Sequence, residues 1–173
     1  ENRSKVLGYS NLAVSSSAYV RGLWAATLQY LVYEGINLTE CRRAPGQAAH
    51  FLQRFLLNQN KDNFLVAYNS LVVMTDFEVL RVSFFKRGSD YFRFYRFIDE
   101  LGGFWLYRWG DHAIRGLGAA IALWMYEVKQ PAEEQLLAYD LQVPYAHQDT
   151  CFCHDPKLKC VDSGKVSSGE EMW

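Results

Sequence analysis

The chain has 173 residues, of which 50% are hydrophobic and 16% aromatic, and its formal net charge is −1. This composition excludes a disordered tail and supports one domain, or part of one, with a substantial core. Lysine and arginine are spread along the chain, so no nucleic-acid-binding surface is indicated, and no stretch reaches the about 18 consecutive apolar residues that a membrane-spanning helix needs.

The first part of the chain predicts a helix. Apolar side chains recur at helical spacing over residues 19–33, and Gly35 is a typical stop after such a stretch. We expect this helix to pack on the core through one face. The residues expected on that face are Leu23, Trp24, Leu28, Leu31 and Val32.

A second helix and a strand are expected next. Pro45-Gly46 interrupts the chain, and apolar residues over 51–56 then predict an amphipathic helix. Residues 58–63 are polar and indicate a loop. The stretch 64–74 is rich in valine, leucine and aromatic residues, so we expect it to contain a strand.

A third helix is predicted over residues 76–86. Thr75 and Glu78 have the spacing of a capping box, in which Glu78 would accept a hydrogen bond from the Thr75 amide at the start of this helix. The same glutamate is a candidate catalytic carboxylate. The residues alone leave both interpretations open.

Two further helices with a strand between them are expected. The first is capped by Ser89 or Asp90 and ends at Gly102-Gly103. Residues 104–109 indicate a short buried strand, and the next helix begins near His112. The residues expected inward are Tyr91, Phe94, Tyr95, Ile98 and Leu101, then Ile114, Leu117, Ile121 and Trp124.

The last part of the chain predicts little regular structure. Pro131 opens a short acidic helix, the chain after Asp140 is mostly irregular, and residues 161–173 are a loose polar tail. Helices outnumber strands, which suits an α/β domain over residues 1–160 whose N-terminal strands are partly missing.

The segment 102–118, GGFWLYRWGDHAIRGLG, is the most informative in the sequence. Packing alone does not demand its combination of paired glycines, aromatic residues and an Arg-Trp-Gly-Asp core. Asp111 is expected where a strand turns into a helix, which is a common position for functional carboxylates. Asp111 is also a good helix cap, and the sequence leaves both roles open.

This segment resembles one that is typical of fungal-type α-1,2-mannosyltransferases, the yeast-type Golgi and glycolipid mannosyltransferases. Upstream segments resemble this family in the same order, so the chain is similar to the family's C-terminal part. The matching residues are Gly102, Gly103, Phe104, Arg108, Trp109, Gly110 and Asp111, and upstream Gly22-Leu23-Trp24 with Thr27, Tyr68-Asn69, Phe77-Glu78-Val79 and Phe84-Phe85.

The resemblance implies a GT-A-type fold and a retaining transfer of mannose from GDP-mannose to a mannose-bearing glycan, with Mn²⁺ as cofactor. It also implies a Golgi-lumen location, with a membrane anchor outside this chain and an N-terminal half that supplies much of the nucleotide and metal sites. Glycosylation triplets at Asn2 and Asn37 agree with a secretory location, and the chain, which begins at Glu1, is expected to be processed or incomplete.

The resemblance also suggests roles for individual residues. Glu78 would be the nucleophile or the carboxylate that stabilises the anomeric centre. Asp111 would orient or deprotonate the acceptor hydroxyl. Arg108 would either offset phosphate charge or brace Asp111. Trp109 and the aromatic residues near it would give a sugar a flat apolar face; the substrate-binding candidates are Tyr68, Tyr107, Arg108 and Trp109.

Some positions depart from the family pattern. Tyr107 stands where the family usually has Glu, His112-Ala113 replaces Ala-Pro, and Arg115 replaces His. Asp76 stands beside Glu78 where the family usually has Asn. Two buried carboxylates so close would repel each other and raise one pKa.

The metal and cysteine assignments stay open. Residues 139–144 correspond to a family segment in which His binds the metal, but Gln142 takes that place, and His147 is the candidate substitute. The cysteines can form disulfides, which the family has in this region, or a zinc site that includes His154. The cysteines concerned are Cys41, Cys151, Cys153 and Cys160.

Two rival hypotheses remain. The first is a non-catalytic glycan-binding or scaffold relative that kept the fold and lost the metal, which Gln142 and Tyr107 favour. The second is a structural domain without a sugar site, which predicts that Glu78 and Asp111 lie far apart, each capping its own helix.

Overall fold

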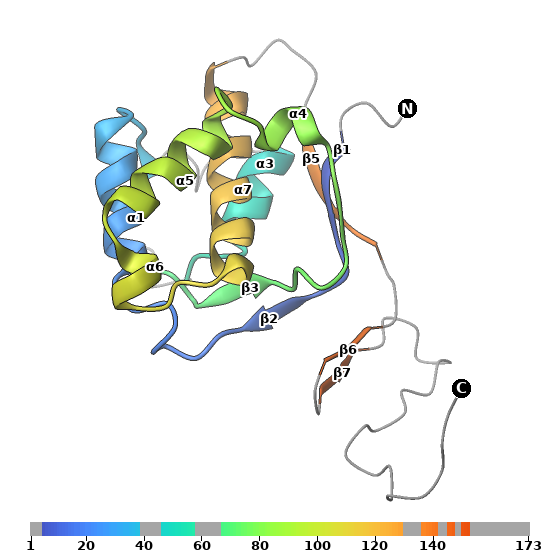
Figure 1. Ribbon diagram of the computed structural model, residues 1–173. Coiled ribbons are helices and arrows are strands. Elements are labelled where there is room, and N and C mark those ends of the chain that lie inside the picture. The colour runs from blue at the N-terminus through green and yellow to red at the C-terminus, as the bar shows by residue number, and fades with distance from the viewer. Residues whose placement is uncertain are drawn as a thin grey trace, which may run out of the picture.

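The long helix α7 (Asp111–Lys129) lies at the centre of the computed structural model (Figure 1), which describes residues 5–38, 46–57, 67–129, 136–141, 145–147 and 150–152. The other helices are α1 (Leu23–Tyr33), α3 (Gln47–Gln53), α4 (Val82–Phe85), α5 (Asp90–Glu100) and α6 (Gly103–Leu106). The strands are β1 (Lys5–Tyr9), β2 (Leu12–Val14), β3 (Leu71–Val73), β4 (Glu78–Leu80), β5 (Leu137–Asp140), β6 (Tyr145–His147) and β7 (Thr150–Phe152). Within these residues no helix has both the length and the apolar character to cross a membrane.

The sheet β4-β1-β5 covers one side of the molecule. The central strand β1 pairs with β4 antiparallel, with Tyr9 opposite Glu78, and with β5 parallel. Val6, Leu7 and Tyr9 are all buried, as expected for a central strand that is covered on both faces. Glu78 is therefore held at the first position of β4 by pairing with β1.

Strands β2 and β3 form a separate antiparallel ladder beside the first turns of α7 (Figure 1). The backbone amide of Met74 donates to the Asn11 carbonyl oxygen at 3.1 Å, which extends the pairing beyond β3. The segment that leads from β3 to β4 consequently passes the N-terminal end of α7, where Asp111 lies.

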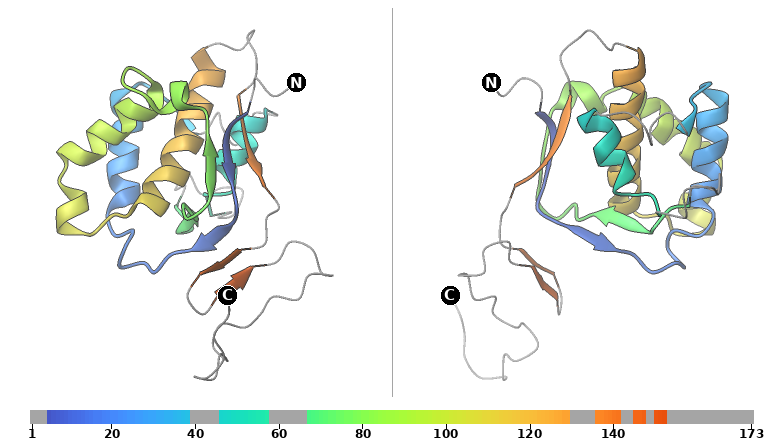
Figure 2. Two further views of the ribbon diagram at one scale, coloured as in Figure 1. Left: turned by 45° about the vertical axis from the view of Figure 1, so that its right-hand side comes forward. Right: turned by 180° about the vertical axis from the view of Figure 1, so that it is seen from behind.

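Helix α7 packs closely on several neighbours because its buried face carries small residues. A Cβ atom on Gly116 would lie 3.0 Å from the Val73 backbone nitrogen, and one on Gly118 would lie 2.8 Å from the Phe94 ring. Glycine at these two positions lets β3 and α5 approach the helix axis. Helix α3 packs on α7 from the side that the right view of Figure 2 brings forward.

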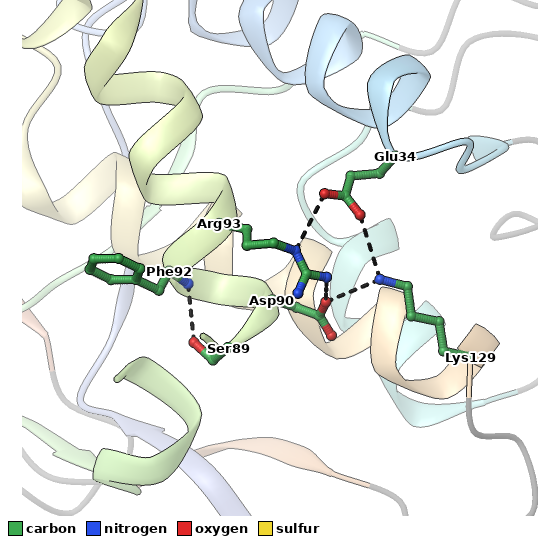
Figure 3. A network of polar contacts seen from close by, with 6 residues as sticks. All are labelled: Glu34, Ser89, Asp90, Phe92, Arg93 and Lys129. Carbon is green, nitrogen blue, oxygen red and sulfur yellow. Dashed lines mark hydrogen bonds and ion pairs between the residues drawn. The ribbon is translucent and has the colours of Figure 1, made fainter. Parts of the chain in front are cut away.

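The C-terminal end of α7 is tied to α1 and α5 by a network of ion pairs (Figure 3). Lys129 Nζ lies 3.6 Å from a Glu34 carboxylate oxygen and 3.1 Å from Asp90 Oδ1. Arg93 contacts the same two carboxylates, Glu34 at 3.4 Å and Asp90 within its own helix. At the start of α5, Ser89 caps the helix by accepting from the Phe92 amide at 3.1 Å; this cap and the αL glycine Gly102 confirm the predicted ends of this helix.

The helix predicted over residues 76–86 is wrong. Residues 78–80 form strand β4, and only 82–85 are helical, in α4. The pattern of Phe77, Leu80, Phe84 and Phe85 fits a helix, but pairing with β1 satisfies the backbone hydrogen bonds of the first half of the segment. The capping box of Thr75 and Glu78 therefore does not form.

The strand predicted over residues 104–109 is also wrong. The chain turns at Gly102, with φ 71°, and forms the short helix α6. The Tyr107 amide donates to the Gly103 carbonyl oxygen at 2.9 Å, so these backbone groups bond locally rather than in a sheet. Trp105 is 87% exposed, and the segment is not a buried strand.

Smaller corrections concern faces and the end of the chain. Leu28, Val32 and Leu101 are exposed, and α1 buries Ala26, Thr27 and Tyr30 in addition to Leu23 and Leu31. The chain after Asp140 is more regular than expected, because β6 and β7 pair with each other. The helix predicted at Pro131 and the tail 161–173 lie outside the described residues. The inward residues predicted for the last helix are confirmed: Ile114, Leu117, Ile121 and Trp124.

Candidate functional site

Three side-chain pairs join the start of α7 to residues 75–78, which lead from β3 into β4. Thr75 Oγ1 donates to Asp111 Oδ2 at 2.6 Å. His112 Nε2 lies 3.6 Å from Asp76 Oδ2, and Arg115 Nε lies 3.2 Å from Glu78 Oε1. We call this group the α7 start cluster; its members are Thr75, Asp76, Glu78, Asp111, His112 and Arg115.

The local fold explains why these residues meet. Asp111 and Arg115 are four residues apart, so their side chains lie on the same side of α7. Opposite them, the pairing of β4 with β1 fixes the backbone at Glu78. Because the predicted capping box does not form, the Thr75 hydroxyl is available to donate to Asp111. The structure thus brings Glu78 and Asp111 into one cluster, contrary to the structural-domain hypothesis.

Glu78 is the least solvated acid of the cluster, with a side chain that is 14% exposed. Burial raises its pKa; the positive charge of Arg115 opposes this shift, and the negative charge of Asp111 adds to it. Arg115 Nε is within ion-pair distance but lacks the alignment of a hydrogen bond, and Glu78 Oε2 is buried without a hydrogen-bond partner among the described residues. A buried oxygen of this kind carries a cost that a ligand can relieve.

The pKa of Asp111 shifts in the other direction, below its ordinary value. Burial alone would raise its pKa, but the hydrogen bond from Thr75, the charge of His112 and backbone amide donors together lower it. Asp111 is also the first residue of α7, where the helix dipole favours a negative charge. Neighbouring carboxyl groups whose pKa values move apart are typical of acid–base sites.

The expected repulsion between Asp76 and Glu78 needs a correction. The acid whose charge raises the pKa of Glu78 is Asp111, and the larger cause is burial. Asp76 turns instead toward His112. The sequence could not show that these two side chains diverge. Residues two positions apart share a face only within one strand, and β4 begins at Glu78, after Asp76.

A cleft of about 340 Å³ borders the cluster. His112 belongs to both, and strands β2 and β3 form the opposite wall. This volume lies within the range of about 300–1,000 Å³ usual for small-molecule sites. The lining residues are Ala13, Val14, Ser15, Tyr19, Val72, Met74, Arg108, Gly110, His112 and Ala113.

Arg108 lies in the cleft wall and does not brace Asp111. Its guanidinium carbon is 5.9 Å from the centre of the Tyr19 ring, and Asp111 accepts from Thr75 instead. Arg108 has a φ of 56°, a left-handed conformation that is uncommon for a residue other than glycine and is enriched at functional sites. Of its two predicted roles, the offset of phosphate charge stays a prediction.

The aromatic candidates are more structural than expected. Trp109 is only 5% exposed, and its Nε1 donates to the Arg21 carbonyl oxygen at 2.8 Å, so its ring is core rather than a flat sugar platform. Gly103 is required beside it, because a Cβ there would lie 2.1 Å from the indole ring. Tyr107 is exposed and stacks on Trp109, and its role in substrate binding stays a prediction.

Tyr68 is placed away from these contacts. Its ring stacks on Trp24 with 6.1 Å between ring centres, and its hydroxyl donates to the Leu71 carbonyl oxygen. Burial raises its pKa. Tyr68 thus links Trp24 of α1 to Leu71 of β3, and none of these interactions involves the described cluster residues.

The described residues supply no metal centre, since no three His, Cys, Asp or Glu side chains among them converge in a way that could hold an ion. His147 lies in β6 and Cys151 in β7, but only their backbone is described. Gln142, Cys41, Cys153, His154, Cys160 and Asn2 lie outside the described residues. The disulfide, zinc and manganese hypotheses stay predictions. Asn37 is exposed just after α1.

Comparison with known proteins supports the sequence resemblance. The family model described as "Glycolipid 2-alpha-mannosyltransferase" matches residues 1–167. The chain is 25% identical over 120 residues to "Probable mannosyltransferase KTR2" of Saccharomyces cerevisiae, covering 61% of the chain and 26% of that protein. It is 33% identical over 87 residues to "O-glycoside alpha-1,2-mannosyltransferase homolog 4" of Schizosaccharomyces pombe, covering 50% of the chain and 18% of that protein.

Solved structures share the fold. The Mn/GDP form of core-mannan synthase A (CmsA/Ktr4) from Aspergillus fumigatus matches 98% of this chain and 42% of its own, with a TM-score of 0.57 and 18% identity. The mannosyltransferase Ktr4p from S. cerevisiae matches 69% of this chain and 29% of its own, with a TM-score of 0.50 and 25% identity. The matched segments cover about a quarter or less of the length of these curated relatives. On the match over residues 1–167, the chain belongs to the glycolipid 2-alpha-mannosyltransferase family.

Proposed function

We propose that the protein containing this chain is a retaining mannosyltransferase, which transfers mannose from GDP-mannose to a mannose-bearing glycan in an α-1,2 linkage. Membership of the family supports the class of reaction. The observation that carries the proposal is the α7 start cluster, which brings Glu78 and Asp111 together and shares His112 with the lining of a cleft.

Glu78 and Asp111 divide the work in this proposal. As the bond from the anomeric carbon to the phosphate breaks, its electron pair leaves with GDP, and the Glu78 carboxylate supports the positive charge that develops on the sugar. Asp111 orients the acceptor hydroxyl, and as the hydroxyl oxygen forms the new glycosidic bond its proton passes to the Asp111 carboxylate. Arg108, in the cleft wall, offsets charge on the diphosphate.

The donor and cofactor come from the resemblance and its relatives. One relative's structure is described as an Mn/GDP form. The described residues of this chain hold no metal-binding set, so no step above depends on a metal ion. A location in the Golgi lumen, with an anchor outside this chain, belongs to the same proposal.

A transfer assay on the complete protein tests the proposal. The complete protein is incubated with GDP-mannose and a mannobiose acceptor, with UDP-glucose as the alternative donor. The mass of the product identifies the sugar added, and NMR gives the linkage and, through the one-bond carbon–proton coupling at the anomeric carbon, its configuration. A mannose added with an α-configured 1,2 linkage is the expected product. A β-configured product contradicts retention, and a product from UDP-glucose alone contradicts the donor.

A non-catalytic glycan-binding relative is the second candidate, because Tyr107 stands at a position where the resemblance predicts a carboxylate. It predicts that the complete protein binds mannobiose in a calorimetric titration and transfers nothing, with or without added Mn²⁺. Transfer that rises with protein concentration excludes this candidate.

A further inference from the structure

Arg115 contacts side chains from three different elements. Its guanidinium carbon lies 4.9 Å from the centre of the Phe85 ring in α4 and 5.6 Å from that of Tyr91 in α5. Its Nε lies 3.2 Å from Glu78 Oε1 in β4. The two rings contact each other, with 4.5 Å between their centres, and together form one aromatic surface beside the planar guanidinium, which stabilises Arg115 and restricts its orientation.

Glu78 depends on this support. From α7 it faces Arg115, Asp111 and His112, and from α5 the hydroxyl of Tyr91. Asp111 repels it, and His112 is engaged with Asp76 at 3.6 Å. Arg115 is therefore the strongest fixed positive charge that Glu78 meets in the described part of the chain. Without it, a poorly solvated carboxylate would remain beside a second one, which is unfavourable.

The contact is also one-sided. Arg115 approaches Glu78 Oε1, whereas Oε2 has no hydrogen-bond partner in the part of the chain that the structure describes. An arginine that served only to neutralise a buried acid would typically form two parallel hydrogen bonds with it. Here Arg115 Nε forms an ion pair with one oxygen only, without the alignment of a hydrogen bond, so the carboxylate is not saturated and its charge is available to a neighbouring group.

We infer that Arg115 is a positioning residue of the transfer reaction, which holds the Glu78 carboxylate ionised and in a fixed orientation through Oε1. This inference rests on the proposed function. It assigns to Phe85 and Tyr91 the task of orienting Arg115, so that a chain of contacts from α4 and α5 fixes a carboxylate in β4.

A direct test follows the carboxyl signal of Glu78 by carbon-13 NMR in the protein labelled at glutamate, with the signal assigned by its loss in Glu78→Gln. Arg115→Met should raise the pKa of Glu78, since the attraction of the positive charge is lost, and Arg115→Lys should raise it less. Arg96→Met is the matched control, because Arg96 pairs with Glu100 on the surface of α5. An unchanged Glu78 pKa in Arg115→Met overturns the inference.

A kinetic test separates positioning from mere support of the fold. In the complete protein, Arg115→Met should lower kcat by about 100-fold, the scale expected for a misplaced catalytic group. The acceptor KM should change little, because Arg115 is not among the residues that line the cleft. Arg115→Lys should recover about tenfold of the loss, since it restores charge but not the planar fork. If Arg115→Met does not fold, Arg115→Lys decides: a kcat equal to that of the wild type overturns the inference.

Failure of the proposed function and failure of the Arg115 inference give different results. If the wild-type protein transfers no mannose, the proposed function fails, and the NMR titration still decides whether Arg115 controls the charge of Glu78. If the wild type transfers mannose and Arg115→Met does so at the same rate, the proposed function stands and the positioning role of Arg115 is wrong.

Discussion

The two ends of α7 carry clusters of charged residues with opposite designs. At the C-terminal end, Glu34 and Asp90 each contact both Arg93 and Lys129, so that two acids are balanced by two bases (Figure 3). At the N-terminal end, the described residues place three acids opposite one arginine and one histidine, and none of them supplies a hydrogen-bond partner for a buried oxygen of Glu78.

The difference separates a structural cluster from a candidate site. Balanced ion pairs join α1, α5 and α7 and leave little charge for a ligand. An excess of carboxylates at the start of α7 is costly for the fold, and such strained groups concentrate at functional sites. The left-handed Arg108 also occurs at the start of α7. A cleft alone does not distinguish the two ends, because Glu34 and Arg93 line one at the C-terminal end as well.

The largest expected effect comes from exchanging one acid at each end. In the complete protein, Asp111→Asn should lower transfer by about 100-fold or more, the scale of a lost acid–base group. Asp90→Asn, at the paired end, should leave transfer unchanged and lower the melting temperature, because Arg93 and Lys129 lose a shared partner. Equal loss of transfer in both variants would remove the distinction between the two ends.

Gly118, in the middle of α7, lies at the contact with α5 that lies between the two charged clusters. A new Cβ would lie 2.8 Å from the Phe94 ring and 3.0 Å from the Tyr91 ring, so α5 must shift. Overpacking costs about 1–3 kcal/mol, against which the better helix propensity of alanine returns about 1 kcal/mol. Urea unfolding of Gly118→Ala should show a net loss of about 1 kcal/mol. The added Phe94→Leu substitution should reduce the cost of the alanine; strict additivity would contradict the clash.

The pH dependence of stability should have opposite signs for the two acids. The lowered pKa of Asp111 contributes stability above its ordinary value of about 3.9, and this contribution is lost as the pH falls below it. The raised pKa of Glu78 favours the protonated form, so its ionised form costs stability as the pH rises above about 4.3. Urea unfolding of Asp111→Asn and Glu78→Gln from pH 3 to 7 measures both trends. The same trend in both variants would contradict the assignment.

The smallest expected effect concerns Lys129. Its amino group is partly exposed, and exposed ion pairs contribute about 0.2–1 kcal/mol. Lys129→Met should lower the free energy of unfolding by that amount in dilute buffer and by less in 1 M salt, where charges are screened. A salt-independent loss would show that the side chain acts by packing.

Strong local signals made part of the fold predictable. The end of α1 at Gly35, the Ser89 cap of α5 and the buried residues of α7 follow from periodicity and from glycine or serine at helix ends. Strands β1 and β5 were not predicted, because each is short and is stabilised by a partner distant in sequence. The same cause made residues 78–80 a strand in a segment with helical spacing.

Part of the candidate site was likewise predictable from the sequence, and part was not. The resemblance singled out Glu78 and Asp111, and the structure places them in one cluster. It gave no sign of the Thr75 hydroxyl bond to Asp111 or of the support that Arg115 gives Glu78. The four-residue spacing of Asp111 and Arg115, which places both on one helix face, was the available signal for the role of Arg115. The burial of Trp109 could not be foreseen, since exposed and buried aromatic residues have the same pattern in a short segment.

The most direct test of the account compares Glu78→Gln with Glu34→Gln in the transfer assay of the complete protein. Both substitutions remove one carboxylate from a charged cluster at an end of α7. The account predicts that Glu78→Gln reduces transfer by about 100- to 10,000-fold while its melting temperature stays close to that of the wild type, and that Glu34→Gln keeps its transfer rate. Full transfer by a folded Glu78→Gln variant would contradict the account.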